Sequence, residues 1–529
     1  MGYVDLDKTA GYQRLAALEA ARSTFDFASL LTAERVNQCQ VPMAAGLRYS
    51  WAAKGVDTPV LEALEALAQE QELIGKYQAI LAGEVMNPGE GRKVLHHLLR
   101  GQLGKPVIHQ GKDIGAFYQQ ELERFSRFSD EVHAGTIRGS TGKAFTTVVQ
   151  IGIGGSDLGP RALYLALEHW AAVAGKQRLL GKFISNVDPD DASQIAASVS
   201  LEETIFVLVS KSGTTQETLA NELFIKAKLH QAGLDPRKHL VAVTSETSPL
   251  AHNPAYLDSF YIDDFIGGRY SSTSGVGGVI LSLAFGKEVF AALLAGAHEA
   301  DTLALEPDIG KNAALLDALI GIWERNFQDY PYTAILPYSQ ALSRFPAHLQ
   351  QLDMESNGKR VNRNGDFLAY ATGPVVFGEP GTNGQHSFYQ LLHQGTDVVP
   401  LQFVGFIESQ RGEDVTVEGS LSQTKLKANL AAQIVAFAKG KADPHGNKVF
   451  LGGRPSSLIY GKQLTPEALG ALLAHFENKV MFQGLVWNLN SFDQEGVQLG
   501  KVLTKQVLAA HGGTSGDPAL DAYSALLGL

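Results

Sequence analysis

Cysteine is almost absent from this 529-residue sequence, which contains Cys39 alone. A single thiol excludes an intrachain disulfide and any zinc site built from several cysteines. Such usage is typical of a reducing compartment, so we expect a cytoplasmic location. The opening segment, MGYVDLDKTAGYQRL, has early acidic residues and no apolar core. This pattern argues against a secretory signal.

Long apolar runs and an excess of basic residues are also missing. The most apolar stretch, 276–297, is interrupted by Lys287, Glu288 and four glycines. A membrane span requires roughly 18 to 20 apolar residues in succession. Lys and Arg number 44 against 55 Asp and Glu, a formal net charge of −11. This charge argues against nucleic acid or an anionic membrane as partner, so an anionic ligand needs a local pocket.

The length predicts at least two domains, because 529 residues exceed what one hydrophobic core normally serves. Residues 11–135 are predicted to be mostly helical, with 57–83 as one clear helical segment. Three apolar, β-rich runs follow, and each ends in glycines or hydroxyl residues before a helical pattern; they are 145–153, 204–210 and 239–246. This alternation indicates a parallel, doubly wound sheet.

A second α/β block follows a helix expected over 276–300. Its strands are predicted at 332–339 and 398–406, and its amphipathic helices at 423–441 and 465–489. A turn-rich stretch, 511–518, then leads to a final short helix.

Two loops between a predicted strand and a predicted helix carry the features of anion sites. The first, Gly152–Gly159, is rich in glycine, and a helix amino terminus offers free N–H donors. A tight turn without a ligand is the alternative. Asp188 lies at the distance of a dinucleotide-site acid, but the glycine spacing does not fit that motif. The second, Ser210–Thr215, has four hydroxyls in six residues, more than helix capping requires, which favours a phosphate monoester.

Four further segments contain candidate catalytic groups. Arg269 follows two glycines and suits a developing oxyanion, although a surface ion pair is equally compatible. Asp353 and Glu355 permit a paired-carboxylate site, but their spacing directs them differently, so a single base at Glu355 is the sharper hypothesis. His386 opens an amphipathic helix, and a metal pair with His393 is improbable. In the last segment, 490–501, Lys501 follows a glycine and is a weak signal by itself.

Together these segments resemble the phosphoglucose isomerase family. The motifs are GIGGSDLGP, SKSGTTQET, GGRYS, MESNGK, TNGQHSFYQLLHQGT and NSFDQEGVQLGK, in the family's order over about residues 90–508. The resemblance implies two sugar-isomerase α/β domains with doubly wound parallel sheets. The implied boundaries are a helical amino-terminal part of the large domain at 1–109, the small domain at 110–283, the large domain at 284–508 and a carboxy-terminal arm at 509–529.

The resemblance also assigns roles to residues that match the family's motifs. It implies Glu355 as the isomerisation base, Arg269 beside the reacting carbons, and His386 and Lys501 in ring opening. The implied substrate contacts are Gly155, Ser156, Ser210, Lys211, Ser212, Thr215, Gln351 and Gln494. Two departures occur. Ser212-Gly213 stands where many members have Thr-Phe, and Glu495 stands where tryptophan is frequent.

The family's reaction interconverts glucose 6-phosphate and fructose 6-phosphate through ring opening and an enediol. The resemblance implies a homodimer, with His386 entering the partner's active site, and no metal or organic cofactor. Two alternatives stay open: an isomerase that also acts on mannose 6-phosphate, and a non-catalytic sugar-phosphate sensor. The retention of Glu355, His386 and Lys501 together argues against the sensor.

Overall fold

The computed structural model describes residues 2–22, 26–510 and 512–529. Two compact units are present: the first ends at Ser491, and the second comprises Phe492–Leu529. The first unit contains both large β-sheets. The described part of the second unit contains helices α17 (Gln498–Ala510) and α18 (Pro518–Leu526). The domain boundaries expected from the sequence stay a prediction.

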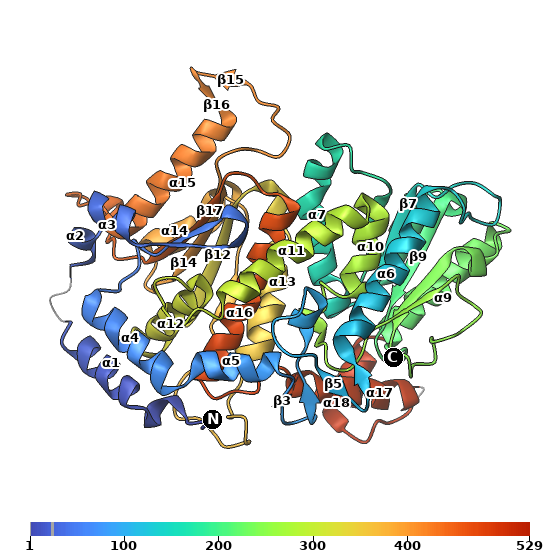
Figure 1. The fold of residues 1–529 in the computed structure, drawn as a ribbon, viewed down its shortest axis with the longest axis horizontal. Helices are drawn as coiled ribbons and strands as arrows, with labels where there is room; N and C mark the ends of the chain where they lie inside the picture. The colour runs from blue at the N-terminus through green and yellow to red at the C-terminus, as the bar shows by residue number, and fades with distance from the viewer. Residues whose placement is uncertain (1, 23–25, 511) are drawn as a thin grey trace. The chain divides into compact units, whose positions relative to one another are not determined.

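A five-stranded sheet forms in the part of the sequence that predicts a doubly wound arrangement (Figure 1). Its strands are all parallel, in the order β11-β10-β9-β7-β8. The strand bounds are β7 Thr147–Ile151, β8 Leu180–Ile184, β9 Thr204–Val209, β10 Leu240–Thr244 and β11 Ser259–Tyr261. β7, β9 and β10 are buried at every position, which a parallel sheet covered on both faces requires.

Helices cover this sheet on both faces. Val149, Ile151, Phe206 and Leu208 pack in one core with residues of α8 and α9, while α10 contacts β7. The helix bounds are α6 Ile114–His133, α7 Leu158–Val173, α8 Pro189–Ala197, α9 Gln216–Gln231 and α10 Gly275–Phe285.

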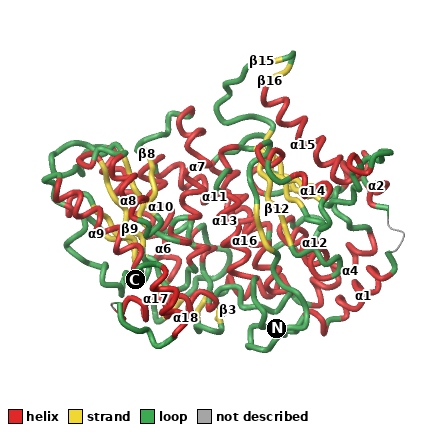
Figure 2. The backbone as a smooth tube through the Cα atoms, turned by 180° about the vertical axis from the view of Figure 1, so that it is seen from behind, coloured by secondary structure: helices red, strands yellow, loops and turns green. Residues whose placement is uncertain are grey.

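A second, mixed sheet has six strands in the order β1-β2-β17-β14-β12-β13. In Figure 2 it is the group of yellow strands that includes β12. The four strands β12, β13, β14 and β17 are parallel, and β2 pairs antiparallel with β17 and with β1. The bounds are β1 Gln40–Pro42, β2 Arg48–Ser50, β12 Tyr332–Tyr338, β13 Val375–Phe377, β14 Leu401–Phe406 and β17 Ser456–Gly461. β1 and β2 lie in the region expected to be mostly helical, and three-residue strands are too short to show a period of two.

Helix α16 (Pro466–Val486) packs against both α11 (Lys287–Leu303) and α12 (Ala313–Asn326). The single helix expected over 276–300 is wrong, because the chain forms α10 and α11 with a break at Gly286, whose φ is 93°. The segment 57–83 also forms two helices, because Glu72 takes a φ of 50°.

The remaining helices lie in the amino-terminal region and around the six-stranded sheet. Their bounds are α1 Ala10–Ala20, α2 Phe27–Leu30, α3 Ala33–Gln38, α4 Thr58–Glu70, α5 Leu73–Leu81, α13 Phe345–Gln350, α14 Tyr389–Gln394 and α15 Ser422–Lys439. Three two-stranded hairpins complete the first unit: β3 Val85–Asn87 with β4 Arg92–Lys93, β5 Ile108–His109 with β6 Lys112–Asp113, and β15 Thr416–Val417 with β16 Ser420–Leu421. In the described ranges, no helix combines the length and the apolar character needed to cross a membrane.

Candidate active site

The two candidate anion loops lie at the carboxyl ends of neighbouring strands in the five-stranded sheet. One loop starts at Gly152, directly after β7, and the other starts at Ser210, directly after β9. The chain adds β8 on one side of β7 and then adds β9 on the other side. Open α/β sheets bind ligands in the crevice at such a switch point. The topology therefore brings both loops to the edge where a ligand is expected.

The loop after β7 lies against the backbone of the segment that carries Arg269. A Cβ atom added to Gly155 would lie 2.2 Å from the carbonyl carbon and oxygen of Gly268. A Cβ atom on Gly154, whose φ is +60°, would lie 3.4 Å from Nε2 of Gln351. The absence of side chains at these glycines therefore allows three chain segments to meet.

We expect Gly155→Ala to lower both stability and activity, because the added methyl group meets backbone that has no room to move aside. The expected destabilisation is about 1 to 3 kcal/mol, measured by urea unfolding. Gly104→Ala is the matched control, since its Cβ meets nothing within 4 Å. Equal stability of the two variants would contradict the close contact.

The loop after β9 forms an open cradle at the start of α9. Ser210 Oγ lies 3.2 Å from both Thr215 Oγ1 and the Gly213 N–H group, and Thr214 N–H donates to Ser212 Oγ at 3.2 Å. Thr215 is the N-cap residue of α9 but makes no capping bond through its side chain. The first N–H groups of α9 therefore receive no capping bond from Thr215 and can donate hydrogen bonds to an anion, which the helix dipole also favours.

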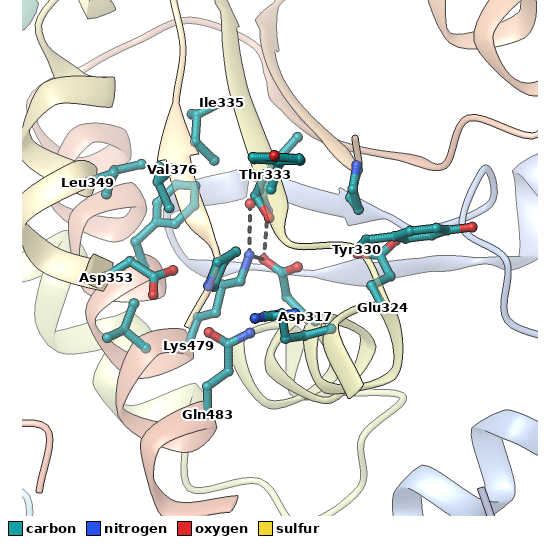
Figure 3. A pocket seen from close by; sticks show the side chains of 18 of the residues that line it. Asp317, Glu324, Tyr330, Thr333, Ile335, Leu349, Asp353, Val376, Lys479 and Gln483 are labelled. Carbon is teal, nitrogen blue, oxygen red and sulfur yellow. Dashed lines mark hydrogen bonds and ion pairs between the residues drawn. The ribbon is translucent and has the colours of Figure 1, made fainter. Parts of the chain in front are cut away.

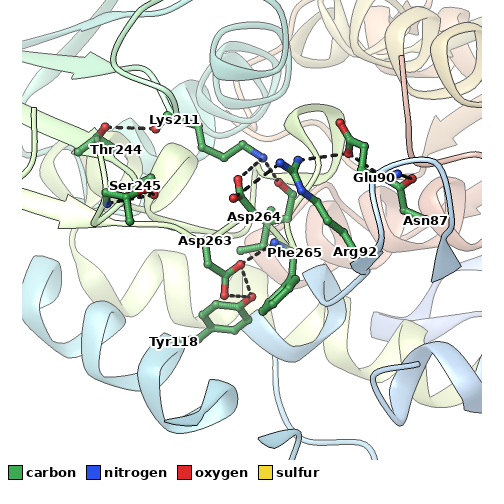
Figure 4. Close-up of polar contacts among 12 residues, drawn as sticks. Asn87, Glu90, Arg92, Tyr118, Lys211, Thr244, Ser245, Asp263, Asp264 and Phe265 are labelled. Atoms are coloured by element: carbon green, nitrogen blue, oxygen red, sulfur yellow. Dashed lines mark hydrogen bonds and ion pairs between the residues drawn. The ribbon is translucent and has the colours of Figure 1, made fainter. Parts of the chain in front are cut away.

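Lys211 extends away from these hydroxyls. Its Nζ donates to the carbonyl of Ile266 at 3.2 Å and lies 3.7 Å from Asp264. Arg92, on β4, also lies 3.7 Å from Asp264 (Figure 4). Burial lowers the pKa of Lys211, Asp264 opposes that shift, and Arg92 adds to it. The structure therefore places a second cation, which the sequence motifs do not reveal, beside the predicted phosphate loop.

Arg269 is the buried centre of the site, with 1% of its surface exposed. Its Nη1 lies 3.2 Å from Glu355 Oε2, Nε donates to Ser356 Oγ at 2.7 Å, and Nη2 donates to the Ser491 carbonyl at 2.6 Å. The guanidinium plane is thus held by partners from two separate segments. A fixed, desolvated cation of this kind stabilises charge that develops on a reacting oxygen.

Glu355 lies at the end of a π-helical turn, Gln351–Glu355, that continues α13. Such turns are rare and occur frequently at functional sites. The Glu355 side chain keeps 24% of its surface exposed. Gln351, at the start of the turn, has a buried Oε1 without a hydrogen-bond partner among the described residues. The turn therefore places the Glu355 carboxylate next to Arg269 and the Gln351 amide next to Gly154.

Asp353 and Glu355 do not form a carboxylate pair. Asp353 lines a cavity of about 30 Å³ on the side of the six-stranded sheet, together with Lys479 and Asp317 (Figure 3). The pKa of Asp353 is raised to about 6, mainly by burial; Lys479 opposes this shift and Asp317 adds to it. Its Oδ1 has no hydrogen-bond partner in the described part of the chain. This geometry favours the single-base hypothesis over the paired-carboxylate one.

We expect Asp353→Asn to change the pH dependence of stability. An acid whose pKa rises from 3.8 to about 6 on folding holds its proton more tightly in the folded state. The wild type therefore loses stability as pH rises from about 4 to about 6, and the loss persists above that window. The difference in unfolding free energy between the variant and the wild type is expected to shift by about 1 to 3 kcal/mol in favour of the variant between pH 4.5 and pH 8. Urea unfolding at both pH values measures this shift, and Asp329→Asn, at an exposed position, is the control. A difference between Asp353→Asn and the wild type that does not change with pH would contradict the prediction.

The three remaining predicted site residues, His386, Gln494 and Lys501, lie in other segments of the chain. His386 ends the short 3₁₀ helix Asn383–His386, and its side chain is exposed, with no hydrogen bond or ion pair among the described residues. In the second unit, Gln494 precedes the 3₁₀ helix Glu495–Val497, and Lys501 is exposed on α17. Their predicted roles stay predictions.

Comparison with known proteins decides the family. The phosphoglucose isomerase family model matches residues 50–519. This chain belongs to the phosphoglucose isomerase family. Glucose-6-phosphate isomerase of Treponema denticola is 58% identical, with 100% of both chains covered. The protein of the same name from Treponema pallidum strain Nichols is 61% identical over 96% of each chain.

Solved structures agree with this assignment to the phosphoglucose isomerase family. A crystal structure of a glucose-6-phosphate isomerase from Chlamydia trachomatis has a TM-score of 0.91 and 40% identity, and each chain covers 99% of the other. The resemblance that the six motifs indicate is therefore confirmed, and so is the α/β fold with two large sheets. The six-stranded sheet differs from the expected parallel arrangement in its antiparallel strands β1 and β2.

The residues that hold Arg269 were not predicted from the sequence. Ser356 and the Ser491 carbonyl accept its hydrogen bonds, and the Tyr270 hydroxyl lies 3.0 Å from Ser356 Oγ. A signal was available for two of them, since Tyr270 follows Arg269 in GGRYS and Ser356 follows Glu355 in MESNGK. Nothing in the sequence indicates that these two motifs meet.

Proposed function

We propose that this chain catalyses the reversible interconversion of glucose 6-phosphate and fructose 6-phosphate, with Glu355 as the base and Arg269 as the oxyanion stabiliser. The observation that carries the residue assignment is the 3.2 Å approach of Arg269 Nη1 to Glu355 Oε2 at a buried junction of the two motifs. Membership of the phosphoglucose isomerase family supplies the reaction.

The phosphate group of the substrate binds in the cradle of Ser210, Ser212 and Thr215. Hydroxyls and the N–H groups at the start of α9 donate hydrogen bonds to its oxygens. Lys211, whose amino group points toward Asp264, adds positive charge beside this loop. Gly155 and Ser156 contribute from the neighbouring loop, 152–159. These contacts position the substrate without taking part in bond changes.

Ring opening comes first, because glucose 6-phosphate is mainly a closed ring. A proton moves from O1 to the ring oxygen as the bond between C1 and that oxygen breaks. We assign this exchange to His386 and Lys501, on the family resemblance of their motifs. The exposure of His386 supports its contribution to the active site of a partner subunit in a homodimer.

Isomerisation then transfers a proton between the two carbons. Glu355 removes the proton from C2, forming a cis-enediol, and returns it to C1 while a hydroxyl proton moves from O2 to O1. Negative charge develops on the oxygens during both transfers, and Arg269 faces it with a cation that does not give up its own proton. Gln351 and Gln494 contact the substrate.

The single cysteine supports our proposal of a cytoplasmic location, where such thiols stay reduced. Conversion of fructose 6-phosphate to glucose 6-phosphate by the purified chain, with chelator present, tests the proposed function. Rapid conversion supports it. Binding of fructose 6-phosphate without conversion would instead support a non-catalytic sensor, and a parallel assay with mannose 6-phosphate measures any side activity.

We expect His386→Ala to impair turnover of the closed-ring substrate by about 10²-fold, the lower range for a lost acid–base group. Exchange of the C2 proton in an open-chain substrate should fall much less, because that step uses Glu355. Isotope exchange measured on both substrates provides the comparison. Equal losses on the two substrates would argue against a role in ring opening.

A further inference from the structure

Arg269 and Glu355 are joined by a third side chain, that of Ser356. This serine is completely buried and directly follows Glu355. Arg269 therefore bonds to two successive residues, through Nη1 to Glu355 at the end of the π-helical turn and through Nε to Ser356, directly after the turn, at 2.7 Å. Because Nε has one N–H group and only donates, the Ser356 oxygen is its acceptor.

Tyr270 holds Ser356 from the opposite side. Its hydroxyl lies 3.0 Å from Ser356 Oγ, and its side chain is 1% exposed. Burial raises the pKa of Tyr270 to about 12, so the phenol keeps its proton at neutral pH. The Tyr270 ring stacks on His96, with ring centroids 4.6 Å apart and planes inclined by 25°.

His96 in turn is buried close to Arg100. It is 4% exposed, and burial together with the nearby Arg100 lowers its pKa well below 6.5, so the ring stays neutral. Arg100 forms a buried ion pair with Asp301 at 3.0 Å and another with Glu477. The ring of Tyr270 therefore packs on a buried histidine near the buried ion pairs of Arg100, which restrict where its hydroxyl can lie.

We infer that Ser356 and Tyr270 are positioning residues that fix the Arg269 guanidinium in the plane required to face the developing oxyanion. The inference rests on the proposed function of Arg269. Without the bond from Nε to Ser356, the guanidinium keeps its charge and its bond to the Ser491 carbonyl but gains freedom to rotate. Since catalytic electrostatics depends on donors held in place beforehand, the loss appears in the transition state and not in substrate binding.

Ser356→Ala tests the inference. We expect kcat for fructose 6-phosphate to fall about 10- to 100-fold, with KM changed less than about twofold. The dissociation constant of sorbitol 6-phosphate, which has no carbonyl group, should stay within about twofold. Ser282→Ala is the matched control, because Ser282 is also completely buried and its Oγ has no hydrogen-bond partner among the described residues.

A double-mutant cycle with Arg269→Lys separates positioning from a general structural role. If Ser356 acts through Arg269, Ser356→Ala should cost little further kcat once Arg269 is lysine. Equal losses in both backgrounds, or an unchanged kcat in the single variant, would overturn the inference. If Ser356→Ala fails to fold, Tyr270→Phe removes the second bond while keeping the ring on His96, with an expected loss of about 3- to 10-fold. A wild-type chain that binds fructose 6-phosphate without converting it would overturn the proposed function instead.

Discussion

Replacing Glu355 with glutamine is expected to lower kcat for fructose 6-phosphate by about 10³- to 10⁴-fold, the upper range for a lost general base. The amide has nearly the same shape and still accepts a hydrogen bond from Arg269 Nη1, which lies 3.2 Å from the carboxylate in the wild type. It cannot take the proton from C2 of the aldose or from C1 of the ketose, so both directions of the reaction stop at the open-chain sugar. Steady-state kinetics in each direction measures the loss.

Two controls make this result specific to proton transfer. The dissociation constant of sorbitol 6-phosphate should change little in Glu355→Gln, because the phosphate cradle is intact. Glu84→Gln removes an exposed carboxylate between α5 and β3 and should leave kcat unchanged. Near-normal turnover by Glu355→Gln would overturn the assignment of the base.

The second large effect is expected for Arg269→Lys. Loss of an oxyanion stabiliser typically costs about 10²- to 10³-fold in kcat. Lysine keeps the charge but has no planar group to reach Glu355, Ser356 and the Ser491 carbonyl together, so this substitution is not conservative here. We also expect a loss of about 1 to 3 kcal/mol in stability, because buried acceptors lose their donor.

Arg138→Lys is the matched control for this variant. Arg138 is exposed and donates to the carbonyls of Gly135 and Gly142, so its replacement removes hydrogen bonds without touching the site. Kinetics and urea unfolding of both variants should separate the two effects. If Arg269→Lys retains more than about a third of wild-type kcat, electrostatic stabilisation by the guanidinium is not required.

Much of the fold was predictable because its strongest signals are local. The buried runs that become β7, β9 and β10 are continuous and β-rich, and they end within one or two residues of the predicted positions. The helix break at Gly286 was missed because the apolar period continues across it, while a φ of 93° there depends on how α10 and α11 pack. β2 was missed because its stabilising partner, β17, lies about 400 residues away.

The candidate site shows the same division. Each motif indicated a chemistry through its own residues, such as the hydroxyls of the loop 210–215. The juxtaposition of Arg269 with Glu355 depends on contacts 86 residues apart in the chain. The different directions of Asp353 and Glu355 follow from their spacing of two residues, as expected. The cavity that Asp353 lines, in contrast, is formed with distant residues such as Asp317 and Lys479, which no pattern in MESNGK reveals.

By itself, the sequence determined the class of fold, the family and the residue types that carry the chemistry, because strand patterns and short motifs depend on neighbouring residues. Only the tertiary structure decided which of those residues meet. Ser356 and Tyr270 hold Arg269, Asp353 turns to a separate cavity, and Arg92 joins Lys211 beside the phosphate loop. These contacts depend on packing between segments that are far apart in the chain. The free energy of that packing depends on both segments, so neither segment's sequence reveals it alone.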